Sequence, residues 1–449
     1  MINQAITESL QTTTITQACT TVQNTDQPKP LSSLKDSLPH GEKDNSSSSV
    51  PLEVAGPAGS EDSDEYARLD ELPKEEHLLL IFSHTQPEKP MVIPTNAKAL
   101  FSMYPLTDAL TRKDCLSVVV EDWATKRPGS VLSGCMPATV SFEIDYAEYL
   151  DEALEESDSY VLRTSLSHNT GLVPRDRQWW ILKPAMTARR DGTRLFSDET
   201  QLRQSFESVE DDDDEISEDG KAKFSNHALA SGAVPSSCLR HFIAQRYISN
   251  IPRLDNRKFH IRAYVLAVGR LSIYLYQELL VISASEPYCP PWESTSRGSA
   301  LTNTHLHGTF FSESARRGFW ALPDDLFGQD GSWKDRAYFR IQQITGECFL
   351  AVATMNTNIA LHPDCFEIFA LDFLIDQDEH VWLMEVNSGP VLSAEGIGSR
   401  IAKGFFKATA DVLLQSEFGL RPRYSNEESM EKVLDVALPN QRFAPLKEV

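Results

Sequence analysis

The stretch from Phe366 to Asn387 constrains the fold of this chain more than any other part of the sequence. It contains two apolar, β-prone runs, Phe366–Ile375 and Val381–Val386, joined by the short polar segment DQDEH. Two such runs separated by a short polar link predict an antiparallel β-hairpin. Any fold for this chain must therefore include a sheet that contains both strands.

Polar side chains interrupt this hairpin. Because side chains alternate across a strand, we expect Glu385 and Asn387 on one face and Trp382, Met384 and Val386 on the other. Asp372 takes a position that should otherwise be apolar, and a buried carboxylate is costly, so we expect a cationic partner for it. Oxygen ligands of this kind suit Mg²⁺, which keeps places for phosphate oxygens. A polar rim on an ordinary hairpin is the alternative interpretation.

Charge divides the chain into segments. The net charge of −23 includes −8 from residues 1–75 and −9 from Glu207–Asp219, so the rest carries about −6. The remaining sequence is therefore only mildly acidic, which argues against general nucleic-acid binding. No apolar stretch approaches the ~20 residues that span a membrane, and no signal peptide is visible.

Composition predicts how these segments behave. Residues 1–75 are rich in Ser, Thr, Gln, Asp and Pro, and we expect them to be disordered because they cannot bury enough apolar surface. Residues 76–170 mix strand and helix patterns, which predicts a small α/β subdomain. Glu207–Asp219 is expected to be a solvated acidic loop, and 421–449 a polar, partly unstructured tail. Seven scattered cysteines without CxxC pairs favour reduced thiols, and we expect a cytoplasmic protein.

Two other predicted strands carry cationic residues, one at its end and the other along one face. Lys183 closes the strand WWILKP ahead of a polar loop, and a helix is expected from Asp198 as N-cap, with Gln201 at the capping-box position. In RKFHIRAYVL, Lys258, His260 and Arg262 share one face. This face suits an anion, although a solvated strand is the alternative.

Further elements are expected along the chain. FIAQRYI (242–248) and Ser272–Leu280 are predicted strands, whereas Glu347–Asn358 and Gly396–Glu417 have helical spacing. The apolar stripe of the second of these helices is expected to be core. A solvated surface is the expected environment of Lys113, Lys126 and Arg127.

Five separated motifs resemble the tubulin–tyrosine ligase domain of the ATP-grasp superfamily. They are WWILKP, IAQRYI, RKFHIRAYVL, YCPP…LTNTHLH and FALDFLID…WLMEVNSGP, which occur in the family's order and extend the resemblance over roughly residues 100–418. The resemblance implies an α+β ATP-grasp fold, in which two α/β subdomains clasp ATP between antiparallel sheets. The catalytic region would be 171–420, with an acidic insertion at 207–220, after the small N-terminal subdomain.

The resemblance also implies roles for individual residues. Lys183 and Lys258 would hold phosphates, and Arg262, Lys258 and Glu385 would be catalytic. Mg²⁺ would be held by Asp372, Glu385 and Asn387. The nucleotide would further be lined by Gln245, Arg246, Tyr247, Ile248, His260, Thr302 and Asn303. The reaction would pass the γ-phosphoryl of ATP to a carboxylate, and an amine would then attack the acyl-phosphate.

Three positions depart from the family pattern. His260 stands where the family has Asp, the loop after Lys183 keeps only Gly192, and Ile282 aligns with an arginine of animal-type members. The default substrates are tyrosine and the α-tubulin C-terminal tail. The alternatives are a glutamate or glycine ligase, another acidic protein C-terminus as acceptor, or a nucleotide-binding module of a cytoskeletal, mRNA-granule or P-body assembly.

Overall fold

The computed structural model describes fifteen stretches of the chain: residues 15–20, 77–83, 97–144, 147–156, 159–185, 193–207, 241–295, 297–300, 302, 315–328, 331–355, 359–390, 392–393, 395–418 and 430–436. Several predictions lie outside these residues. They concern Asn303, Gly192, the acidic segment beyond Glu207 and most of residues 1–75.

The larger sheet has seven strands and contains the predicted hairpin. Its order is β11-β10-β8-β12-β13, and β9 pairs with both β8 and β14. The strands are β8 (Phe259–Val268), β9 (Ser272–Tyr276), β10 (Leu280–Ser283), β11 (Arg316–Gly318), β12 (Phe366–Ile375), β13 (Val381–Ser388) and β14 (Met430–Asp435). All of these pairings are antiparallel. The hairpin prediction is confirmed, whereas the single strand predicted over Ser272–Leu280 is wrong, because β9 and β10 are separate.

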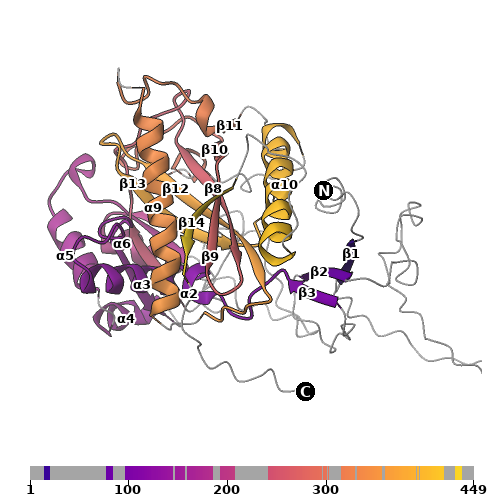
Figure 1. Ribbon diagram of the computed structural model, residues 1–449. Helices are drawn as coiled ribbons and strands as arrows, with labels where there is room; N and C mark the ends of the chain where they lie inside the picture. Colours follow the sequence, from indigo (N-terminus) through magenta and orange to yellow (C-terminus); the bar gives the residue numbers. More distant parts are fainter. Residues whose placement is uncertain are drawn as a thin grey trace, which may run out of the picture.

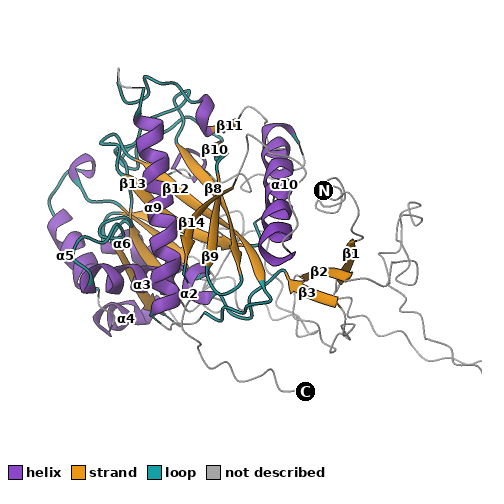
Figure 2. Cartoon of the chain, in the orientation of Figure 1, coloured by secondary structure: helices purple, strands orange, loops and turns teal. Residues whose placement is uncertain are grey.

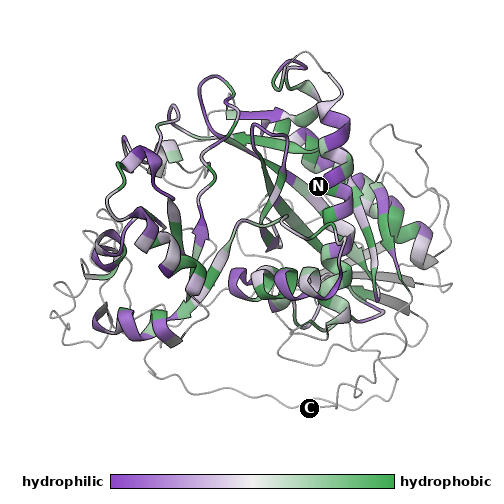
Figure 3. Cartoon of the chain, turned by 90° about the vertical axis from the view of Figure 1, so that its left-hand side faces the viewer, coloured by the Kyte–Doolittle hydropathy of each residue, from purple (hydrophilic) through white to green (hydrophobic). Residues whose placement is uncertain are grey.

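Helices cover both faces of this sheet (Figures 1 and 2). Phe259, Ile261 and Ala263 of β8 belong to one apolar cluster with α3 (Lys113–Lys126) and α9 (Trp333–Thr354). Side chains that alternate with them, such as Tyr264, pack against α10 (Gly396–Phe418). The apolar colour of the strands between these helices is visible in Figure 3. The prediction that α10 presents a core stripe is confirmed, and α9 begins earlier than its predicted segment.

A second sheet has four strands in the order β4-β7-β5-β6. The strands are β4 (Thr139–Glu143), β5 (Trp180–Pro184), β6 (Arg194–Phe196) and β7 (His241–Arg246). One apolar cluster joins this sheet to α4 (Leu150–Glu156), α5 (Tyr160–Asn169) and α6 (Glu199–Glu207). The sheet combines β4 with strands from beyond residue 170, so it crosses the subdomain boundary drawn from the sequence.

Short elements complete the described chain. They are α2 (Asp108–Thr111), α8 (Arg297–Ala300) and the 3₁₀ turns η2 (Ala147–Tyr149), η3 (Pro174–Asp176) and η7 (Phe319–Ala321). None of the described helices is long and apolar enough to cross a membrane.

The start of α6 follows its predicted capping pattern. The Gln201 amide donates to Asp198 Oδ1 at 2.9 Å, and the Gln201 side chain accepts from the Ser197 amide at 2.8 Å. Two backbone donors that the helix itself cannot satisfy are thus paired. This fixes the start of α6 beside β6.

Two strands occupy segments for which the sequence predicted none. Residues Ile15–Thr20 form β1, which pairs in parallel with β2 (His77–Ser83), and β2 pairs with β3 (Ala97–Phe101). β14 lies within the predicted C-terminal tail and joins the larger sheet beside β9. Both short runs contain β-branched residues, and each strand depends on a partner distant in sequence.

Candidate active site

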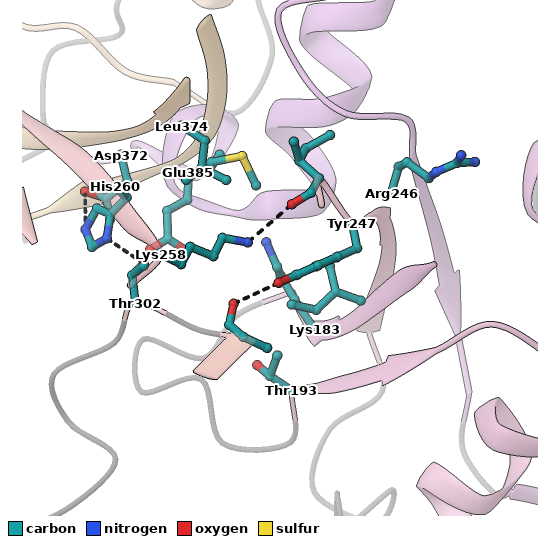
Figure 4. Close-up of a pocket in the computed structure, with 14 residues that line it drawn as sticks. Lys183, Thr193, Arg246, Tyr247, Lys258, His260, Thr302, Asp372, Leu374 and Glu385 are labelled. Carbon is teal, nitrogen blue, oxygen red and sulfur yellow. Dashed lines mark hydrogen bonds and ion pairs between the residues drawn. The ribbon is translucent and has the colours of Figure 1, made fainter. Parts of the chain in front are cut away.

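A pocket lies between the two sheets and encloses about 580 Å³ of empty space, open solvent included (Figure 4). The smaller sheet and its loops contribute Ile181, Lys183, Thr193, Arg246, Tyr247 and Ile248. The larger sheet and neighbouring segments contribute Lys258, His260, Ala300, Thr302, Asp372, Leu374, Met384 and Glu385. The pocket thus gathers most of the described residues that the sequence singled out.

Asp372 has the cationic partner that its burial predicted. It lies opposite Arg262 in the β12–β8 register, and its two oxygens accept hydrogen bonds from Arg262 Nε and Nη2, each at 2.8 Å. Burial alone would lower the pKa of the Arg262 guanidinium, but the charge and hydrogen bonds of Asp372 raise it above its ordinary value. Arg262 is not among the residues that line the pocket, whereas Asp372, to which it is hydrogen-bonded, is.

The acidic cluster is completed across the hairpin. Glu385 lies opposite Asp372 in the β12–β13 register, and the Asn387 amide lies 3.4 Å from Glu385 Oε1 and 3.5 Å from Asp372 Oδ2. The three side chains therefore meet on one face, as the alternation predicted for Glu385 and Asn387.

Trp382 and Met384 are not where alternation placed them, because the apolar core contains Val381, Leu383 and Val386 but neither of these two residues. The register shifts between Asp372 and Phe373, so that Met384 has no partner in the β12–β13 pairing and lines the pocket next to Glu385. Val386 points into the core, as predicted. A β-bulge of this kind breaks the two-residue period, because two residues on one strand face a single residue on the other.

The donor set fits one Mg²⁺ shared with a nucleotide. Among the described residues there is no group of three or more His, Cys, Asp or Glu that could hold a metal. Asp372 and Glu385 instead supply two carboxylates, and Asn387 supplies a side-chain amide whose Nδ2 donates to both of them and whose oxygen would have to turn toward a metal to bind it. Mg²⁺ commonly binds through one or two carboxylates and completes its shell with phosphate oxygens and water.

Three lysines approach the pocket. Lys183 Nζ donates to Gln245 Oε1 at 2.7 Å, and Lys258 Nζ lies 3.5 Å from the Ile248 carbonyl oxygen and 4.0 Å from the Tyr247 ring centroid. The predicted roles of Lys183 and Lys258 are consistent with this placement. Lys258 is only 5% exposed, so the solvated-strand alternative is wrong.

The third lysine, Lys113, was predicted to lie on a solvated surface, and that prediction is wrong. Lys113 is buried at the start of α3, and its Nζ lies 3.8 Å from Glu385 Oε2. Lys126 on the same helix is exposed, as expected. No local pattern distinguishes the two lysines, because the burial of Lys113 arises from the distant hairpin.

His260 is buried where the family pattern has Asp. Its Nδ1 lies 2.6 Å from Thr302 Oγ1 and its Nε2 lies 3.7 Å from Asp372 Oδ1. His260 therefore links Thr302, which also lines the pocket, to the acidic cluster. Ile282 lies opposite His260 on β10 and is itself opposite Arg316 on β11.

The strand β7 and the residues after it form another wall. Gln245 is fully buried, and its side-chain amide donates to Thr139 Oγ1 at 3.0 Å. The Arg246 amide donates to the Ala138 carbonyl at 2.8 Å, and the Tyr247 amide donates to the Trp179 carbonyl at 2.9 Å. These bonds fix the backbone of the wall beside the two lysines.

Comparisons with known proteins agree with this arrangement. The model of the family described as the tubulin-tyrosine ligase family matches residues 95–415. A probable tubulin–tyrosine ligase of Schizosaccharomyces pombe is 38% identical over 69% of this chain and 76% of that protein. A probable tubulin polyglutamylase of Homo sapiens is 25% identical over 65% of this chain, but the match spans only 42% of that protein.

A solved structure also resembles the chain. It is the C-terminal domain of K. lactis Pby1, described as an ATP-grasp enzyme that interacts with the mRNA decapping enzyme Dcp2. The TM-score is 0.54 at 25% identity, and the match covers 80% of this chain and 88% of the Pby1 domain. The fold is thus that of an ATP-grasp domain, as the sequence implied.

Proposed function

Because the chain belongs to the tubulin-tyrosine ligase family, we propose that it is an ATP- and Mg²⁺-dependent ligase that joins an amino acid to a protein carboxylate. The observation that carries this proposal is the pocket between the two sheets. Lys183 and Lys258 line it from one sheet each, and Asp372 and Glu385 line it from the hairpin. This arrangement offers cations to phosphate and oxygen ligands to a divalent metal.

The lysines would hold the phosphates. Lys183 contacts the side-chain oxygen of Gln245, and Lys258 contacts the Ile248 carbonyl. Both contacts are to neutral oxygens, and an ammonium binds a charged phosphate oxygen more strongly than a neutral one. A nucleotide phosphate would therefore replace these contacts at a gain in free energy.

The backbone of the residues after β7 would contact the adenine base. The amides of Arg246 and Tyr247 already donate within the protein, so they cannot donate to a base. The backbone contact would fall to Ile248 and to carbonyl oxygens of the same stretch. Tyr247 would supply an apolar ring beside the pocket.

The hairpin would hold the metal, with Asp372, Glu385 and Asn387 as its protein ligands. When bound, Mg²⁺ would neutralise charge on the phosphates and align the γ-phosphoryl for transfer. Arg262 would orient Asp372 through the two hydrogen bonds that it donates to the carboxylate. His260 and Thr302 would position the same carboxylate from the nucleotide side.

The reaction would proceed in two steps. An oxygen of the acceptor carboxylate would form a bond to the γ-phosphorus of ATP as the bond to the β–γ bridging oxygen breaks, which releases ADP. The amine of the amino acid would then attack the acyl carbon, release inorganic phosphate and lose a proton. Lys258 and Arg262 would lower the cost of the negative charge that develops.

Ligation with single amino acids tests this proposal. The protein is incubated with ATP, Mg²⁺, tubulin and one amino acid at a time, and the acceptor mass is measured. We expect tyrosine addition by wild type, and we expect Glu385→Gln to abolish it while leaving the unfolding midpoint unchanged. Glu121→Gln, which changes an exposed carboxylate of α3, is the matched control. Retained turnover in Glu385→Gln contradicts the assignment.

The same experiment separates tyrosine from the other amino acids. Addition of glutamate or glycine instead would assign a ligase of the same fold with another amino acid. Ile282, which aligns with an arginine of animal-type members, motivates this alternative. The acceptor is tested in parallel with other proteins that end in acidic residues.

A second candidate function is a nucleotide-binding interaction module in a cytoplasmic mRNA-granule assembly. The similarity to the Pby1 domain, which interacts with Dcp2, favours it. Calorimetry with ATP and Mg²⁺ separates the two candidates. Tight nucleotide binding without ADP release in the presence of any amino acid and acceptor would support the module.

A further inference from the structure

A second arginine lies on the same face of the larger sheet as Arg262. His260 on β8, Ile282 on β10 and Arg316 on β11 lie opposite one another in consecutive registers. Residues directly opposite each other share a face of the sheet. Since neighbouring strands lie about 4.8 Å apart, the Arg316 backbone lies about 10 Å from that of His260. Arg316 therefore lies on the β10 side of β8, whereas Asp372 and Glu385 lie on the opposite side, on β12 and β13.

Arg316 is held in place at a half-buried position. Its Nη1 donates to Ser393 Oγ, in the segment that follows the hairpin. A Cβ added at Gly398 would lie 3.4 Å from Arg316 Nη1, so this glycine leaves room beside the guanidinium. Burial lowers the pKa of the Arg316 guanidinium, and the nearby positive charge of Arg262 lowers it further. The Tyr264 hydroxyl acts in the opposite direction and raises this pKa.

The surrounding charges favour an anion at this position. Arg262 shares its charge with Asp372, which accepts both of its hydrogen bonds. Further along β11, Arg400 of α10 pairs with Glu278 at 3.1 Å. Arg316 places a guanidinium on the same face of the larger sheet as Arg262. A guanidinium fork matches a carboxylate in shape and charge.

We propose that Arg316 binds a substrate carboxylate on the face of the larger sheet that also carries His260 and Arg262, at the edge formed by β10 and β11. The inference rests on the proposed ligase function, which brings together two carboxylate-bearing substrates. One source is the α-carboxylate of the free amino acid, and the other is a carboxylate of the protein acceptor. Ile282 lies between Arg316 and His260 and contributes an apolar side chain without charge.

Four variants isolate the role of Arg316. Arg316→Leu removes the guanidinium. Arg316→Lys keeps the positive charge but loses the paired N–H donors that can bind both oxygens of a carboxylate. Arg317→Leu is the matched control, because Arg317 follows on the same strand, points to the opposite face and pairs with Asp255. Ser393→Ala removes the hydroxyl that Arg316 contacts and reports a merely structural role.

Steady-state kinetics of ligation give the first readout. For Arg316→Leu we expect the KM of one carboxylate substrate to rise about 10- to 100-fold, the effect of losing a charged hydrogen-bonding partner. Arg316→Lys should recover part of the loss, and the KM for ATP should stay unchanged. The substrate whose KM rises identifies the source of the carboxylate. If Ser393→Ala reproduces the whole effect, or if no KM rises, the proposal is wrong.

Binding without turnover gives the second readout. The unfolding midpoint is measured with a non-hydrolysable ATP analogue and Mg²⁺, and with tyrosine, glutamate, glycine or an α-tubulin C-terminal peptide. Each probe is compared with a derivative in which its α-carboxylate or C-terminal carboxylate is replaced by a neutral amide. Wild type should be stabilised more by the acid than by the amide of one probe, and Arg316→Leu should lose the difference.

The two readouts keep this inference separate from the proposed function. Wild type that distinguishes acid from amide but does not ligate contradicts the ligase and supports the carboxylate site. Wild type that ligates, with Arg316→Leu unchanged in KM and in acid preference, overturns the carboxylate site alone. Acid and amide that stabilise wild type equally for every probe overturn it as well.

Discussion

Arg262 and Asp372 form a two-pronged ion pair across neighbouring strands, with Nε and Nη2 each 2.8 Å from a different carboxylate oxygen. The Asp372 side chain is 1% exposed and that of Arg262 is 21% exposed. Both charges are therefore largely removed from water, and each depends on the other for compensation. The pair joins β8 to the hairpin at the position where Asp372, Glu385 and Asn387 meet.

Breaking this pair from one side should destabilise the fold. Arg262→Leu leaves a buried, uncompensated carboxylate, and we expect a loss of about 3–5 kcal/mol in the free energy of unfolding. The double variant Arg262→Leu/Asp372→Leu should recover most of that loss but no ligation. Urea denaturation and the ligation assay measure the two properties separately. A double variant as unstable as the single one would show that the pair is not the cause.

The sequence predicted the elements that depend on local periodicity. Phe366–Ile375 is an apolar, β-prone run and Lys258–Arg262 alternates between polar and apolar residues, and both strand predictions agree with the structure. The position of Asp372 also predicted that it has a cationic partner, because a carboxylate inside an apolar run requires a nearby cation.

Features set by distant partners could not be predicted in this way. The burial of Lys113 depends on Glu385, and the exposure of Met384 to the pocket depends on where the β12–β13 register shifts. Arg316 belongs to a three-residue strand that is too short to give a periodic signal. Its place in the site follows only from the register of β10 and β11.

Removal of the Lys113 ammonium should weaken nucleotide binding. Its Nζ lies 3.8 Å from Glu385 Oε2, and both side chains are 10% exposed, so Lys113→Met leaves more negative charge beside the phosphate site. We expect the Kd for ATP with Mg²⁺ to rise about 10-fold, equivalent to one lost charged contact of about 1.5 kcal/mol. Calorimetry measures this, with Lys126→Met on the exposed side of the same helix as the control. Equal Kd values for the two variants would exclude Lys113 from the site.

The carboxyl group of Glu367 should make stability depend on pH. Burial raises its pKa above the ordinary 4.5, although hydrogen bonds from Ser388 and the Tyr104 amide oppose that rise. A raised folded-state pKa means that its contribution is fully present below the unfolded pKa and is lost as pH rises through the folded value. Relative to Glu367→Gln, wild type should therefore lose free energy of unfolding as pH rises above the ordinary pKa of 4.5 and through the raised folded-state pKa. Denaturation across this range measures the difference.

A second carboxyl group supplies the control of opposite sign. Burial alone would raise the pKa of Glu347, but hydrogen bonds from Ser130, Trp123 and the Val131 amide lower it. Relative to Glu347→Gln, wild type should lose stability as pH falls through the lowered pKa, because protonation removes the favoured charged form. Parallel pH profiles for both variants would contradict the assignment of the two shifts.

Gly346 in the middle of α9 should be needed for the attachment of β14. Alanine favours a helix over glycine by about 1 kcal/mol, yet a Cβ at this position would lie 2.7 Å from the Val433 carbonyl oxygen. That oxygen belongs to the backbone, so β14 or α9 would have to shift. We therefore expect Gly346→Ala to speed hydrogen exchange of the amides in Met430–Asp435 by at least about 10-fold, because their pairing with β9 is weakened. In a chain that ends at residue 429, the same substitution should instead be neutral or stabilising, since the clashing oxygen is gone. Unchanged exchange in the full chain would show that α9 and β14 accommodate the methyl group without separating.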